Sequence, residues 1–133
     1  MARIFIVDDH EPFRKKLRLL IEAQEDWEVC CEAADGTEAV DKHCSVKPHL
    51  TIMDFNMPGL DGLRASRKIL ANCPKATILM ITVFASRQLA DEAKRVGIKG
   101  FCSKINVDCI TEAITTVLAG KTYFPESFLQ AGA

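Results

Sequence analysis

Short apolar runs alternate with longer amphipathic stretches along most of the chain, and this alternation is the feature that most restricts the possible folds. Several of the runs are continuously apolar, a pattern typical of parallel strands that are buried on both faces. We therefore predict five β-α units of an α/β fold, in which helices cover both faces of one parallel sheet. The predicted strands occupy residues 3–7, 27–33, 50–53, 77–81 and 100–103.

The stretches between these runs carry apolar residues at helical spacing. Pro12 suits the first turn of a helix, whereas Gly97 and Gly120 suit the position just after one. Residues 121–133 are too few for a further domain, so we expect one domain over 1–120, followed by a linker or C-terminal tail. The predicted helices occupy residues 12–24, 37–47, 60 or 62 to 71, 86–95 and 106–119.

Composition restricts the possible partners and location. The chain has 133 residues, is 48% hydrophobic and carries a formal net charge of -1, so it can build a core but has no bulk basic field for nucleic acid. The first predicted strand begins within three residues, which leaves no room for a signal peptide. The longest apolar stretch, 76–85, is about half as long as a membrane-spanning helix. We expect a soluble, cytoplasmic protein without membrane contact.

Two further groups of residues resemble a basic binding patch and a metal site, but we expect an ordinary structural explanation for both. Basic residues gather between Arg14 and Arg18, and we expect them to form one solvated helix face. The six cysteines include no C-x-x-C pair, so we expect reduced thiols rather than a zinc site. His43 and Cys44 are adjacent, but we expect His43 to be a solvated histidine rather than a metal ligand.

Charged and hydroxyl side chains follow four of the predicted strands. In open parallel sheets, ligands bind beyond the C-terminal strand ends, where the strand order reverses. Asp8 and Asp9 follow the first strand, Asp54 the third, Thr82 the fourth and Lys104 the fifth. Each residue alone has an ordinary explanation, such as a turn, a helix cap or a solvated lysine. Their meeting at one edge of one sheet makes the combination more informative than its members.

This combination predicts phosphoryl-transfer chemistry. Neighbouring carboxylates repel one another, and a hard divalent cation such as Mg2+ relieves that repulsion. We interpret Asp54 as the nucleophile that accepts a phosphoryl group to form an acyl phosphate. Lys104 would pair with the phosphoryl oxygens as a point charge, and Thr82 would donate one hydrogen bond to them.

Five motifs occur in order along the chain. They are Ile6-Val-Asp-Asp-His-Glu-Pro-Phe-Arg14, Ala34-Asp-Gly-Thr-Glu-Ala-Val40, Met53-Asp-Phe-Asn-Met-Pro-Gly-Leu-Asp-Gly62, Ile81-Thr82 and Gly100-Phe-Cys-Ser-Lys104. In order and spacing, these motifs resemble the receiver domain of bacterial two-component response regulators, and the opening motif resembles the NarL/FixJ type in particular. The resemblance extends from about Arg3 to Ala119.

The resemblance implies a fold and a metal site. The fold would be flavodoxin-like and doubly wound, with five parallel strands in the order 2-1-3-4-5 and five helices. Asp54 would be the phosphoacceptor. Mg2+ would be held by Asp8, Asp9, Asp54 and the backbone carbonyl of Asn56, with Asp9 as the most direct ligand.

The resemblance also implies a switch and its partners. Thr82 would be the switch hydroxyl, Lys104 the phosphate-pairing lysine and Phe101 the aromatic whose rotamer follows Thr82. A sensor histidine kinase would supply the phosphoryl group, and phosphorylation would promote a homodimer or release a transcriptional output domain. DNA would be bound only through such an effector domain, usually a helix-turn-helix. The receiver would be a signalling domain rather than an enzyme, with self-catalysed phosphotransfer and slow autodephosphorylation.

Some residues depart from the family pattern, and two other functions fit part of the sequence. Ile105 follows Lys104 where many receivers have Pro, and the bulky Phe84 is expected to shield the phosphoryl group from hydrolysis. A Mg2+-dependent aspartyl phosphatase would need an acid-base residue two positions after Asp54, where this chain has Asn56. A receiver-fold interaction module that is not regulated by phosphorylation would not need the acidic residues.

Overall fold

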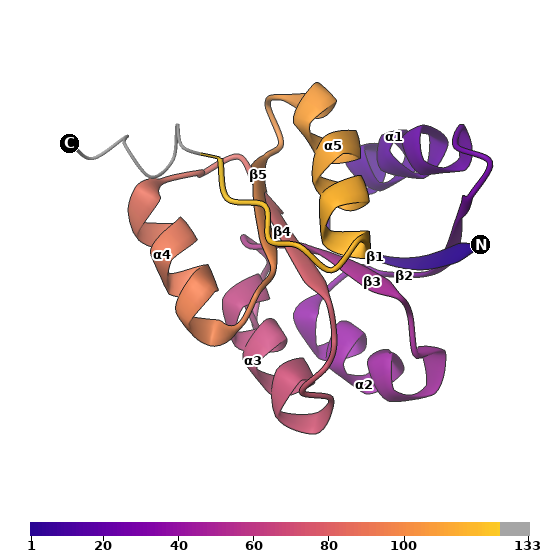
Figure 1. Ribbon diagram of the computed structural model, residues 1–133. Helices are drawn as coiled ribbons and strands as arrows, with labels where there is room; N and C mark the ends of the chain where they lie inside the picture. The colour runs from indigo at the N-terminus through magenta and orange to yellow at the C-terminus, as the bar shows by residue number, and fades with distance from the viewer. Residues whose placement is uncertain (126–133) are drawn as a thin grey trace.

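The chain folds into one parallel sheet covered by helices on both faces (Figure 1). The computed structural model describes residues 1–125. The five strands lie in the order β2-β1-β3-β4-β5, which confirms the predicted flavodoxin-like topology. The strands are β1 (Ala2–Val7), β2 (Trp27–Ala33), β3 (Leu50–Asp54), β4 (Ile78–Thr82) and β5 (Gly100–Ser103). The helices are α1 (Glu11–Glu22), α2 (Gly36–Val46), α3 (Gly62–Asn72), α4 (Arg87–Val96) and α5 (Val107–Leu118).

The sheet has a separate hydrophobic core on each face. Helices α1 and α5 pack on one face, where Leu17, Ile21 and Ile114 meet alternate residues of the central strands. Helices α2, α3 and α4 cover the other face (Figure 1), with Ile69 and Ala90 among the buried contacts. Strands β3 and β4 are buried along their whole length, which explains why most of their residues are apolar.

A close backbone approach fixes the loop after β3. The amide of Gly62 donates a hydrogen bond to the carbonyl of Phe55 over 2.7 Å. A Cβ atom at position 62 would lie 2.0 Å from the carbonyl oxygen of Asp54, so only glycine fits there. The side chain of Asp61 caps α3 by accepting a hydrogen bond from the Arg64 amide over 2.8 Å. The end of β3 is thus held directly against the start of α3.

The segment after α5 returns to the sheet. Tyr123 forms a parallel bridge with Gly100. The amide of Phe101 donates to the carbonyl of Tyr123 over 2.8 Å, and the amide of Tyr123 donates to the carbonyl of Lys99 over 2.9 Å. The start of the expected tail is therefore bound to the edge of β5. The rest of that expectation, residues 126–133, lies outside the described part of the chain.

The expectation that His43 is solvated is wrong. Its side chain lies on the inner side of α2, and the residue is only 6% exposed. Burial lowers the pKa of this imidazole below its usual value, which favours the neutral form. The sequence around His43 is polar enough to suggest an outward position, but the rotation of α2 on the sheet turns it inward.

Candidate functional site

Three carboxylates meet where β1 and β3 end. The two strands are paired in parallel, with Val7 opposite Met53, so the residues after them arrive at the same edge. Asp8, Asp9 and Asp54 each present an oxygen within 4.8 Å of the others. Asp8 and Asp54 are buried, whereas Asp9 is exposed. The structure therefore brings together the acidic residues that the sequence placed at two strand ends.

Lys104 lies among these carboxylates. Its Nζ atom is 2.6 Å from Asp8 Oδ2 and 3.3 Å from Asp54 Oδ1. The loop after β5 is held by the amide of Lys104, which donates to the carbonyl of Thr82 over 3.0 Å. Only 10% of the lysine side chain is exposed, so the ammonium group is largely shielded from water. One cation thus partly neutralises the acidic group.

The surroundings of Asp54 disfavour its charged form. Burial and the neighbouring charge of Asp8 raise the pKa of Asp54 from 3.8 to about 7, although Lys104 acts in the opposite direction. The carboxylate form of Asp54 is therefore costly in the absence of a further cation. A divalent cation beside the three oxygens would lower that cost.

The donor set fits a hard metal ion. Asp8 Oδ1 accepts a hydrogen bond from the amide of His10 over 2.9 Å. Asp8 Oδ2 is buried and accepts no directed hydrogen bond within the described residues, so its contact with Lys104 is an ion pair only. Oxygen atoms with open lone pairs are the ligands that Mg2+ prefers.

A cavity of about 520 Å³ opens over this group. Four residues expected at the site line it, namely Asp9, Asp54, Asn56 and Lys104. Three apolar side chains line it as well, and sequence reasoning assigned none of them to the site. They are Phe13, Val83 and Ile105. Val83 and Ile105 directly follow Thr82 and Lys104, so adjacency to predicted site residues was a usable signal.

The remaining predicted residues lie outside the cavity lining. Thr82 is fully buried, and its Oγ1 accepts a hydrogen bond from the amide of Phe84 over 3.0 Å. Phe101 is fully buried and packs within the core of the α3 and α4 face. Phe84 is 59% exposed and does not line the cavity, so this geometry does not support the expected shielding role. Val83, rather than Phe84, lines the cavity.

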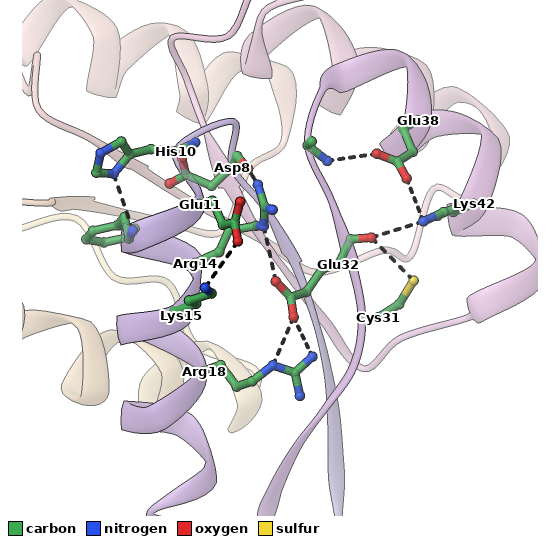
Figure 2. A network of polar contacts seen from close by, with 12 residues as sticks. Asp8, His10, Glu11, Arg14, Lys15, Arg18, Cys31, Glu32, Glu38 and Lys42 are labelled. Atoms are coloured by element: carbon green, nitrogen blue, oxygen red, sulfur yellow. Dashed lines mark hydrogen bonds and ion pairs between the residues drawn. The ribbon is translucent and has the colours of Figure 1, made fainter.

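A second charged group lies beside the site, on α1 and β2 (Figure 2). Arg14 Nε is 3.1 Å from Glu32 Oε1, and Arg18 binds Glu32 Oε2. Arg14 Nη1 also donates a hydrogen bond to the backbone carbonyl of Asp8 over 2.6 Å. Ion pairs to Glu32 order these two arginines, and only Arg14, with 17% of its side chain exposed, is clearly less solvated than we expected.

A model of the response regulator receiver domain matches residues 4–115. The chain belongs to this family. It is 38% identical over 123 residues to the oxygen regulatory protein NreC of Staphylococcus aureus, and 32% identical over 126 residues to the transcriptional regulatory protein LnrK of Bacillus subtilis. These alignments cover 91% and 94% of the chain but 57% of each relative, so the chain spans little more than half the length of either protein.

Solved structures agree with the assignment as a receiver domain. A LuxR-family response regulator from Aurantimonas sp. SI85-9A1 superposes with a TM-score of 0.94 at 32% identity, over 99% of this chain and 97% of the other. The isolated receiver domain of RcsB from Salmonella enterica shares the fold, with a TM-score of 0.87 at 24% identity and coverage of 96% and 95%. The protein is thus a signalling receiver of the NarL/LuxR type. Within residues 1–125, no helix of the receiver is long and apolar enough to cross a membrane.

Proposed function

We propose that this receiver accepts a phosphoryl group on Asp54 from a sensor histidine kinase and, as a result, changes conformation. The observation that supports this function best is the meeting of Asp8, Asp9 and Asp54 with Lys104 at a cavity open to solvent. The family assignment gives the same reaction class. In the cell we expect the protein to work in the cytoplasm, where such kinases present their phosphohistidine.

Mg2+ is the cofactor that fits this proposal. It would be held by Asp8, Asp9, Asp54 and the backbone carbonyl of Asn56. When bound, Mg2+ would neutralise the charge that builds on the phosphoryl oxygens during transfer. It would also favour the carboxylate form of Asp54, which is the form that can attack phosphorus.

The chemical step is a displacement at phosphorus. An Oδ atom of Asp54 forms a new bond to phosphorus, while the bond from phosphorus to the donor breaks and the donor keeps its electron pair. Lys104 already lies 3.3 Å from Asp54 Oδ1, so its ammonium can pair with a phosphoryl oxygen after a small movement. Hydrolysis of the acyl phosphate would reset the receiver.

The switch would begin at Thr82. Its Oγ1 now accepts the Phe84 amide, and turning toward a phosphoryl group would break that hydrogen bond. Phe101 lies on the neighbouring strand β5 and is the aromatic that would respond. We propose residues 1–120 as the receiver and 121–133 as a linker toward an effector domain. Output would be dimerisation or release of that domain, through which alone DNA would be bound.

The proposal is tested by labelling with acetyl phosphate and Mg2+, followed by intact-mass measurement. We expect the wild-type chain to gain one phosphoryl group and Asp54→Asn to gain none. Asp61→Asn is a matched control, because Asp61 is a nearby carboxylate that caps α3 and asparagine caps helices equally well. A labelled Asp54→Asn chain would contradict the assignment, and steady turnover of small phosphoesters would indicate a phosphatase instead.

A further inference from the structure

The ammonium group of Lys104 has a third neighbour besides the two carboxylates. Its Nζ atom lies over the ring of Phe13, 4.5 Å from the ring centroid. This distance is within the range of a cation–π interaction. Because the lysine side chain is only 10% exposed, the ring face occupies a direction from which water would otherwise solvate the ammonium.

The Phe13 ring is placed by the same loop that carries the acidic residues. The amide of Phe13 donates to His10 Nδ1 over 3.3 Å, which caps the start of α1. The amide of His10 in turn donates to Asp8 Oδ1 over 2.9 Å. Asp8 Oδ2 then contacts Lys104, which closes a ring of contacts back to Phe13. The position of the aromatic ring is thus linked to that of the acidic group.

The three neighbours of Lys104 differ in what else they can bind. Asp8 and Asp54 are candidate ligands of a divalent cation, so such a cation competes with Lys104 for their oxygens. The Phe13 ring is a neighbour that a hard cation with oxygen preference does not engage. It can therefore hold the ammonium near Asp54 when the carboxylates are used elsewhere.

We propose that Phe13 is a positioning residue that holds the Lys104 ammonium beside Asp54 for phosphoryl transfer. The inference rests on the proposed phosphoacceptor function and adds a residue to it. The ring does not touch the reacting atoms. It acts through its negative π face, which attracts the lysine and fixes the direction from which the positive charge meets the phosphoryl oxygens.

The test replaces Phe13 in the full chain by phenylalanine analogues with increasing ring fluorination. Fluorine weakens the negative face of the ring while its shape is nearly conserved, so the fold is preserved. At saturating Mg2+ and acetyl phosphate, we expect the rate of labelling to fall stepwise, by about 3- to 10-fold for the most fluorinated ring. Phe13→Leu should show a similar loss, and Phe13→Tyr should restore most of the rate.

A double-mutant cycle separates this role from simple packing. In a Lys104→Met chain, the same ring series should have no effect on the remaining slow labelling. Equal rates across the ring series in the Lys104 chain would overturn the proposal, and so would an equal loss with and without Lys104. If the wild-type chain itself is never labelled, the proposed function fails first, so the two failures are distinguishable.

Discussion

Two charged groups lie side by side at one end of the molecule, and they differ in burial and in charge balance. In the group of Asp8, Asp9 and Asp54, the ammonium of Lys104 contacts only Asp8 and Asp54, and these two carboxylates are the buried ones. Glu32, in contrast, is half-buried between two guanidinium groups (Figure 2). The first group has more carboxylates than cations, whereas the second has a cation for each carboxylate oxygen.

The difference appears in the pKa values of the two groups. Asp54 has its pKa raised to about 7 by burial and by Asp8, so its charged form is disfavoured. Arg18 has its pKa raised by its hydrogen bond to Glu32, so its charged form is favoured. An arrangement that disfavours its own charges stores free energy that a ligand can release. The difference supports the proposed binding site at the first group and a structural role for the second.

The largest expected effect is a gain in stability when Asp54 loses its charge. Without Mg2+ at pH 8, we expect Asp54→Asn to raise the free energy of unfolding by about 4 kcal/mol, since the pKa of Asp54 is raised from 3.8 to about 7 and one pKa unit corresponds to about 1.4 kcal/mol. Because the folded-state pKa of Asp54 is raised, the protonated carboxyl contributes its full stability below about pH 4, and this contribution is lost as pH rises through about 7. Urea unfolding across this range measures it.

The gain from Asp54→Asn should therefore disappear below about pH 4, where the wild-type carboxyl is protonated in both the folded and the unfolded chain. A mutant that is less stable than the wild type at pH 8 would show that Asp54 is already compensated. In that case the contrast between the two charged groups would not hold.

The next largest effect is expected from Mg2+ binding at the acidic group. At 100 times its dissociation constant, Mg2+ should stabilise the wild-type chain by about 2.7 kcal/mol, because it binds only the folded state. Thermal unfolding with and without Mg2+ measures this. Asp54→Asn and Asp9→Asn should respond much less, whereas Glu32→Gln should respond like the wild type. Equal responses in all four chains would place the metal elsewhere.

The smallest expected effect comes from the balanced group. Glu32→Gln removes a charge that is paired with Arg14 and Arg18, so we expect a loss of about 1 kcal/mol in the free energy of unfolding. Glu25→Gln, at an exposed position outside the group, should change stability by a few tenths of a kcal/mol at most. Urea unfolding at pH 8 measures both. If Glu32→Gln were as stabilising as Asp54→Asn, the two groups would be alike.

The fold was predictable because the pattern of apolar residues reports burial directly. Short continuous runs such as 78–81 favour strands that are covered on both faces, and parallel strands of that kind need crossover connections, usually helices. The acidic group was predictable for a related reason. Residues that follow parallel strands must meet at one edge, whatever the details of packing, so Asp8 and Asp54 could be placed together from the sequence.

The contacts that were missed depend on how helices rotate and where loops turn. Spacing predicts which residues of α1 face the sheet. It does not predict that the Phe13 ring on α1 lies beneath the ammonium of Lys104, which comes from the loop after β5. The same holds for His43, which the rotation of α2 buries, and for Glu32, which meets α1 only after β2 has paired with β1. Pairs of this kind join segments that no local pattern relates.

The bridge between Tyr123 and Gly100 also bears on self-association of the sheet. Open strand edges are the places where folded proteins aggregate through continuous pairing. At β5, the amide of Phe101 is already used by Tyr123, so an incoming strand cannot pair there without displacing it. At the opposite edge, β2 carries Glu28 and Glu32, and its register with β1 is interrupted by an irregularity. Both edges of the sheet are thus less able to pair with a strand of another molecule, β5 because Tyr123 uses its amide and β2 because of its charges and irregular register.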